Sequence, residues 1–351
     1  MAAPMVRFTP ARLVGLLAAL AAVAVASFAL CVRFGEQPVS LLSALSDPAS
    51  TDAAILWSLR VPRAVLGAIV GAALATSGTA LQSLMRNPLA DPFVLGVSGG
   101  AALGATLAIA LGLGVVGDLG VTDAGSAAAR LSAPSLFAFA GSAGAIALVF
   151  AVSRVQGQTS PYAALLSGVI FNAFASAAIT CVKVLASPDR LGDILYWLAG
   201  TLGYERGWTL AGAALLQLLA IGLIWSHAAP LNALTLGDED AASLGVEVAR
   251  TRRTLLFATS LSVAGAVALS GLVGFVGLIV PHLLRLWLGP DNRLLVPCSA
   301  LGGAIFLMLS DLAARLLFRA IAAEPPVGVI TALLGGPFFL VLLRRRHGLA
   351  L

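Results

Sequence analysis

The sequence predicts an all-α, polytopic membrane protein with about ten transmembrane helices. Three observations support this fold class. Of the 351 residues, 59% are apolar and only 11% are charged, whereas about 25% are charged in an ordinary soluble domain. Mean hydropathy is +0.99, and long apolar runs recur along the whole chain. A soluble fold of this size cannot bury so much apolar surface, so the composition excludes a disordered chain, a nucleic-acid-binding domain and an ordinary cytosolic enzyme.

Crossing a hydrocarbon core of about 30 Å needs about 20 mostly apolar residues, and on this criterion we count about ten spans. Lipid satisfies no backbone hydrogen bonds, so each run is expected to be a helix. The span 277–288 is short, and the boundaries near 187–206 are the least defined. We treat residues 1–351 as one transmembrane domain. The predicted spans are 11–33, 62–84, 93–116, 134–153, 161–186, 207–226, 252–272, 277–288, 294–317 and 327–343.

The first run is predicted to remain as a membrane helix. It follows Arg7 and Arg12, but it is longer than the apolar region of about 7–15 residues in a signal peptide. An even number of spans places both termini on one side of the membrane. That side then holds more arginines than the other, including three near the C-terminus. Because arginine is enriched in cytoplasmic loops, we expect both termini to be cytoplasmic.

Small residues recur at helical spacing within the spans and predict a closely packed bundle. They allow helix backbones to approach each other in lipid, where apolar burial does not drive association. The main examples are Gly67, Gly71, Ala75 and Gly78, then Gly99, Gly100 and Gly104, and then Gly271, Gly274 and Gly277.

The sequence contains none of the motifs that would supply an energy source or a reaction. The pattern G-x-x-x-x-G-K-[ST] is missing from the sequence, and the sole lysine, Lys183, follows no glycine-rich loop. The three cysteines and three histidines are scattered, so we expect no metal site and no catalytic residues. Asp311 is the main acid within a span and lies four residues before Arg315, with which it can pair. A transporter with no ATPase motif and no obvious ion-coupling residue needs energy from another protein.

Several ordered motifs carry a resemblance to a known family from about residue 55 to the end. The sequence resembles the FecCD-type permeases of ABC importers for ferric siderophores, haem and cobalamin. It departs from the family in having Pro325 where a leucine usually precedes Pro326. The motifs are RVPR at 60–63, GAALATSG at 71–78, RNPLADP at 86–92, LGVSGGA at 95–101, GFVGLIVPH at 274–282 and GGPFF at 335–339.

The resemblance implies an ATP-driven importer in the bacterial inner membrane. It implies a homodimer around a central pathway, two cytoplasmic ATPase subunits that use ATP and Mg²⁺, and a periplasmic substrate-binding protein. This chain itself is expected to bind no cofactor and no nucleic acid. Haem is the first expected substrate, a ferric siderophore the second and cobalamin the third, because Arg86 and Asp91 look more like the iron and haem branch. An ion-coupled secondary carrier and a membrane-bound enzyme are the alternatives from other classes.

The resemblance also assigns site residues. Arg60, Arg63 and Arg315 match positions that meet acidic side chains of the binding protein, for which the planar guanidinium is well suited. The alternative is that these arginines reach lipid headgroups. Asn87, Pro88 and Leu89 match a cytoplasmic gate, where a proline-bounded turn can close the pathway. The second gate element is placed at Thr159 and Ser160.

The polar stretch at about 229–248 matches the loop that forms short coupling helices on the ATPase. An amphipathic pair with a glycine break can transmit a push between domains. An ordinary solvated loop is the alternative interpretation. The coupling residues are expected to be Leu231, Leu234, Leu236, Gly237, Asp238, Ala241, Leu244 and Gly245.

Overall fold

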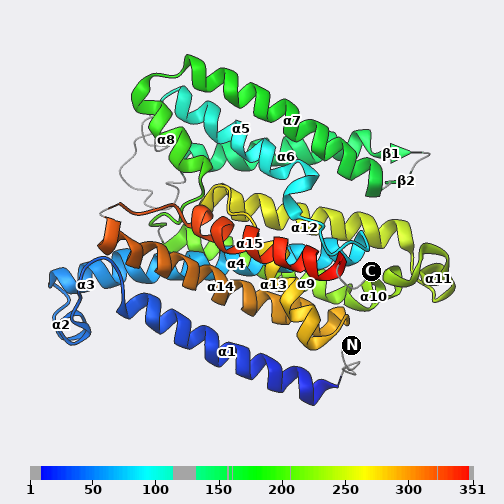
Figure 1. Cartoon of the computed structure of the whole chain (residues 1–351), viewed down its shortest axis with the longest axis horizontal. Coiled ribbons are helices and arrows are strands. Elements are labelled where there is room, and N and C mark those ends of the chain that lie inside the picture. The colour runs from blue at the N-terminus through cyan, green and yellow to red at the C-terminus, as the bar shows by residue number, and fades with distance from the viewer. Residues whose placement is uncertain are drawn as a thin grey trace.

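The computed structural model describes residues 9–113, 132–155, 158–159, 161–205, 207–321 and 323–347. Their helices lie roughly side by side along the long axis of the molecule (Figure 1). Seven are long and apolar enough to cross a membrane, and three shorter apolar helices accompany them. The predicted all-α, polytopic fold with about ten spans is therefore confirmed.

The long helices begin and end close to the predicted spans. They are α1 (Pro10–Arg33), α4 (Val61–Leu84), α6 (Ala133–Val152), α7 (Pro161–Leu185), α9 (Gly207–Ser226), α12 (Val248–Ser270) and α14 (Asn292–Ile321). The three with shorter apolar stretches are α5 (Val97–Ala110), α13 (Val276–Leu288) and α15 (Val327–His347), of which Val327–Leu340 is the apolar part.

Short elements mark the two ends of the bundle (Figure 1). The α2 end carries α2 (Leu41–Ser46), α3 (Thr51–Ile55) and α8 (Pro188–Leu198). A π-helical turn, η1 (Leu56–Arg60), joins α3 to α4. The α10 end carries α10 (Ala228–Leu236), α11 (Asp238–Ser243) and the antiparallel hairpin of β1 (Arg154–Val155) and β2 (Gln158–Thr159). Helix α1 begins and α15 ends at this same end, as an even number of spans requires.

The predicted span 93–116 was wrong at its beginning. A 3₁₀ turn, η2 (Pro92–Leu95), comes first, and the Asp91 carboxylate accepts a hydrogen bond from the Phe93 N–H at 2.9 Å. Gly96 then adopts φ +83°, a left-handed conformation that favours glycine, and α5 begins only at Val97. The helix ends at Ala110, and residues 114–116 lie outside the described part of the chain.

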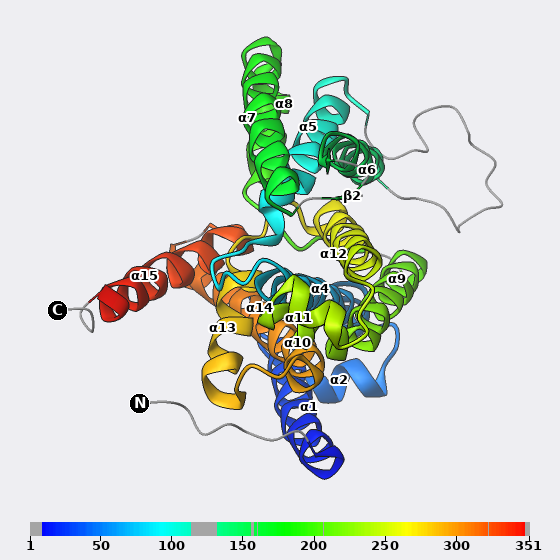
Figure 2. The ribbon, with the colours of Figure 1, turned by 90° about the vertical axis from the view of Figure 1, so that its right-hand side faces the viewer.

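Helix α4 lies at the centre of the bundle. Figure 2 shows it end-on among α9, α12, α13 and α14, with α5, α6 and α7 grouped on one side and α1 on the opposite side. A methyl group on Gly71 would overlap the backbone carbonyl of Gly303 in α14, and one on Gly78 would overlap that of Gly277 in α13. The predicted small-residue packing is therefore confirmed at these crossings. Gly274 has open space around it and plays no such part.

Candidate functional site

A buried cluster of charges joins α4, α14 and the segment before α15 at the α2 end. Arg63 donates through Nε and Nη2 to Asp311 Oδ1 at 2.9 and 2.7 Å. Arg315 Nε lies 2.9 Å from Asp311 Oδ2, which confirms the predicted pair on one face of α14. Glu324 forms a second ion pair with Arg63. Asp311 is 1% exposed, so two arginines share one carboxylate that water scarcely reaches.

Arg60 and Arg315 hold the C-terminal end of α1. Arg60 Nη1 donates to the carbonyls of Val32 and Arg33 at 2.9 and 3.0 Å, and Nη2 donates to the carbonyl of Gln37. Arg315 Nη1 donates to the Cys31 carbonyl at 3.1 Å. The last carbonyls of a helix lack intrahelical donors and carry partial negative charge, so guanidinium groups stabilise this end.

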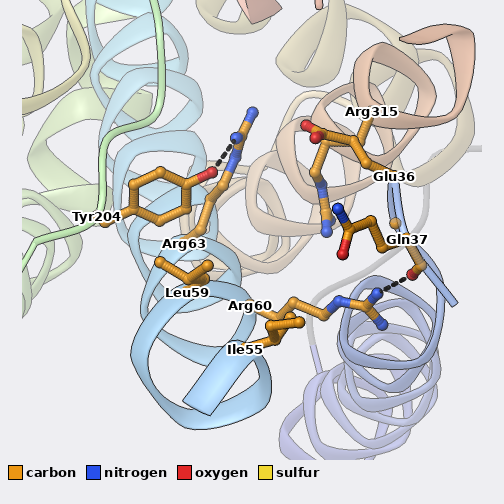
Figure 3. A pocket seen from close by; sticks show the side chains of 9 residues that line it. Glu36, Gln37, Ile55, Leu59, Arg60, Arg63, Tyr204 and Arg315 are labelled. Atoms are coloured by element: carbon orange, nitrogen blue, oxygen red, sulfur yellow. Dashed lines mark hydrogen bonds between the residues drawn. The ribbon is translucent and has the colours of Figure 1, made fainter. Parts of the chain in front are cut away.

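A small cavity of about 170 Å³ opens between these arginines (Figure 3). Arg63 Nη1 lies 3.4 Å from the Tyr204 hydroxyl, which accepts its hydrogen bond at one side of the cavity. Burial raises the pKa of the Glu36 carboxyl, and the neighbouring Glu324 adds to this effect. The cavity is lined by Gly35, Glu36, Gln37, Ile55, Leu59, Arg60, Arg63, Tyr204 and Arg315.

The structure brings the three predicted docking arginines together at one end, but it buries them. Arg60, Arg63 and Arg315 are only 5%, 6% and 4% exposed, and all three have partners within the chain. This burial disagrees with the alternative in which they extend to lipid headgroups.

The first predicted gate element lies at the opposite, α10 end. Asn87, Pro88 and Leu89 form the turn between α4 and η2, and Asn87 Oδ1 accepts a hydrogen bond from the Leu89 N–H at 2.9 Å. Asn87 and Leu89 are exposed. Thr159 belongs to β2, whose strand contacts α12, and Ser160 lies outside the described residues.

The polar stretch forms the predicted pair of short helices, α10 and α11, with Gly237 between them at φ +148°. Leu231, Leu234 and Ala241 are fully buried against the bundle. Leu236 and Leu244 are 66% and 65% exposed, so they present apolar side chains outward. Five of the eight predicted coupling residues therefore divide into an anchoring set of three and an outward-facing set of two. Gly245 turns the chain toward α12 at φ +82°.

Sequence reasoning missed the residues that attach this helix pair to the rest of the bundle. Arg86 contacts both α10 and α11. Asn232 of α10 contacts Asp291 and Asn292 at the start of α14. Arg86 belongs to the RNPLADP motif and Asn232 to the polar stretch at about 229–248. Their partners are distant in the sequence, so the contacts could not be anticipated.

Comparison with known proteins decides the family. A model of the FecCD transport family matches residues 17–345. This chain belongs to the FecCD transport family. Among FecCD relatives, the cobalamin import system permease protein of Halobacterium salinarum is 45% identical over 85% of this chain and 75% of its own length. The hemin transport system permease protein of Yersinia pestis is 40% identical over 83% of this chain and 84% of its own.

A solved structure supports the same assignment. It shows a metal-chelate type ABC transporter in an inward-facing conformation, and it matches with a TM-score of 0.78 at 31% identity. The match covers 95% of this chain and 99% of that one. The family resemblance predicted from the motifs is confirmed, and the chain is a multi-pass membrane permease, a transport subunit.

Proposed function

We propose that this FecCD permease is the membrane subunit of an ATP-driven, binding-protein-dependent importer of a bulky metal chelate across the bacterial inner membrane. Haem or another iron chelate is the first candidate substrate, and a ferric siderophore or cobalamin is the alternative. The match of the family model over residues 17–345 carries this proposal. The names of the hemin and cobalamin relatives and of the metal-chelate transporter support the substrate class.

Energy comes from a separate ATPase in this proposal. The sequence has no P-loop motif. Ion-coupled carriers usually place ionisable groups along a path within the membrane, whereas Asp311 is fixed by two arginines. Two cytoplasmic ATPase subunits, which use ATP and Mg²⁺, would bind the exposed face of α10 and α11, where Leu236 and Leu244 project. This chain performs no catalysis and holds no cofactor of its own.

The transporter is proposed to contain two copies of this chain. Helices α7 and α15 project from the body of the subunit in Figure 2. Both carry exposed apolar side chains, among them Ile170 and Phe174 on α7 and Leu333 on α15, which are 61%, 65% and 66% exposed. Such surfaces are covered by lipid or by a second subunit. A mainly apolar pathway between two copies would let a large ligand pass without being trapped.

The α10 end, with both termini, is proposed to face the cytoplasm, and the α2 end the periplasm. A periplasmic binding protein would then dock over Arg60, Arg63 and Arg315. Since Glu324 already pairs with Arg63, an acidic side chain of the binding protein would exchange with it. The gate would lie at the cytoplasmic end, at Asn87, Pro88 and Leu89, with Thr159 and Ser160 as its second element.

Reconstitution tests the substrate assignment. The permease and its ATPase are placed in liposomes, and the cognate binding protein is loaded in turn with haem, a ferric siderophore and cobalamin. The proposal predicts ATP-dependent uptake of one of these chelates, with haem or an iron chelate preferred. Uptake of none of them, with a binding protein that holds its ligand and an active ATPase, would contradict the proposal.

A further inference from the structure

Arg86 occupies a backbone conformation in which glycine is usually found. Helix α4 ends at Leu84, the Arg86 N–H donates to the Ser83 carbonyl at 3.2 Å, and the Asn87 N–H donates to the Gln82 carbonyl at 3.0 Å. These two bonds form the Schellman motif that closes a helix, in which the residue at the position of Arg86 is left-handed. Arg86 has φ +50°. A side chain larger than hydrogen is strained there, so the reason for arginine lies in what its side chain contacts.

The Arg86 guanidinium bridges the two short helices at the α10 end. Its Nε donates to the Leu234 carbonyl in the last turn of α10 at 2.8 Å, and its Nη2 donates to Asp238 Oδ1 at the start of α11 at 2.6 Å. Arg252 of α12 holds the same carboxylate through both oxygens at 3.0 Å. Arg86 therefore bridges α10 and α11 across the break at Gly237. Because Arg86 immediately precedes the gate turn, its hydrogen bonds connect both helices to that turn.

A second, buried connection joins the same helix pair to the last turn of α4. Asn232 Oδ1 accepts hydrogen bonds from the Asn292 N–H at 2.9 Å and from Asn292 Nδ2 at 2.8 Å. The Ser83 hydroxyl donates to Asn292 Oδ1 at 2.9 Å. Asn292 and Ser83 are 0% and 1% exposed. Parting buried polar groups leaves them without partners, which is unfavourable, so this connection keeps α10 and the end of α4 together.

We propose that Arg86 is a positioning residue that transmits the movement of α10 and α11 to the gate turn at Asn87–Leu89. The buried Asn232–Asn292–Ser83 connection holds α10 at the last turn of α4, so the helix pair moves about this contact. Through the half-exposed Arg86–Asp238 pair, a movement of α10 and α11 displaces the gate turn. This inference rests on the proposed function, because it requires a partner that moves α10 and α11.

The experiment uses the complete transporter, permease with its ATPase, in lipid nanodiscs. Leu89, which is 43% exposed, is replaced by cysteine as a reporter in the gate turn. The exposed Cys181 is first removed by Cys181→Ser, and Cys31 and Cys298 are buried. The rate of maleimide alkylation at position 89 is measured without nucleotide and with ATP plus vanadate. The difference between the two states reports the response of the gate turn.

Arg86→Gly is the decisive variant, because glycine is the residue that this backbone conformation favours and the Schellman motif stays intact. In the reporter background, we expect nucleotide and vanadate to change the alkylation rate by about tenfold, and Arg86→Gly to abolish most of this change. The ATPase should copurify with Arg86→Gly in the usual ratio. Arg250→Gln is the matched control, since Arg250 pairs with Glu247 at the same end and is far more exposed; it should leave the response unchanged.

The other outcomes of this experiment separate a failure of the inference from a failure of the proposed function. If Arg86→Gly responds as strongly as the background, the inference is wrong and the proposed function stands. If Arg86→Gly loses the ATPase during purification, Arg86 acts in subunit docking and not in transmission, and the inference is again wrong. If the background still hydrolyses ATP and accumulates the chelate but its alkylation rate does not respond, the proposed ATP-driven gate is wrong, and the inference falls with it.

Discussion

Asp311 is the residue on which the α2 end depends most. It is 1% exposed and pairs with both Arg63 and Arg315, which are themselves buried, and Glu324 supplies the second negative charge of the cluster. Asp311→Asn keeps the shape but leaves one buried positive charge too many. Breaking a buried ion pair on one side costs about 3–5 kcal/mol, so we predict a clear fall in Tm of the purified permease in detergent. Glu247→Gln, at an exposed pair, should leave Tm within error. An unchanged Tm for Asp311→Asn would mean that the cluster does not hold these helices.

Glu324 is predicted to compete with the binding protein. It pairs with Arg63 from the segment before α15, and Glu324→Gln removes this carboxylate while Arg63 keeps its hydrogen bonds to Asp311. A carboxylate of the binding protein then meets less competition, so the Kd of docking should fall by about threefold to tenfold, in the range of a single ion pair. Surface plasmon resonance with the cognate binding protein measures this. Unchanged or weaker docking would exclude an exchange at Arg63.

The sequence predicts contacts between residues that are close in the chain, but not contacts between residues that are far apart in it. Asp311 and Arg315 lie one helical turn apart, so their pair could be predicted from spacing alone. Arg63 and Asp311 are separated by 248 positions in the sequence, and nothing local indicates that contact. Arg60, Arg63 and Arg315, which the family resemblance singles out, do lie at one end of the molecule, and their docking role stays a prediction. Their burial and their partners within the chain emerged only from the packing of α4 against α14 and α1.

At the scale of elements, the crossing of α4 and α14 depends on two glycines. Gly71 meets the backbone of Gly303, and a methyl group there would overlap the facing carbonyl. Gly71→Ala should destabilise the permease by about 1–3 kcal/mol, as overpacking does, and should lower Tm. Gly222→Ala on α9, where the added methyl meets open space, should leave Tm unchanged or raise it, because alanine favours the helix. Equal effects at both glycines would contradict close packing at the crossing.

The helices that the sequence predicts have long apolar runs, whereas the elements that it misses are short or are set by local turns. Long apolar runs such as α7 and α9 begin at the predicted residues because the hydrocarbon core requires continuous helix. Helix α8 was not predicted as an element, since it has only 11 residues and lies with one face outward at the α2 end. The span 93–116 was misjudged because hydropathy does not register a 3₁₀ turn capped by Asp91 or the left-handed Gly96.

At the scale of the whole molecule, the two ends are proposed to face opposite sides of the membrane. The structure puts the beginning of α1 and the end of α15 at the end that carries α10 and α11 (Figure 1), and the excess of arginine predicts that this end is cytoplasmic. In a Cys181→Ser background, Leu42→Cys on α2 and Leu236→Cys on α10 are exposed reporters, at 81% and 66%. In spheroplasts that express the permease without its ATPase, which would otherwise cover Leu236, a membrane-impermeant maleimide should label Leu42→Cys in intact spheroplasts and Leu236→Cys only after lysis. The reverse pattern would overturn the proposed orientation.

In the proposed transporter, this FecCD permease contributes a pathway while a separate ATPase supplies the energy. The most direct measurement is accumulation of the chelate in proteoliposomes that contain the permease with or without its ATPase and binding protein. With both partners, we predict uphill accumulation that requires ATP on the α10 side and stops with vanadate. The permease alone should accumulate nothing under a proton or sodium gradient. Uphill accumulation by the permease alone, driven by such a gradient, would contradict the account.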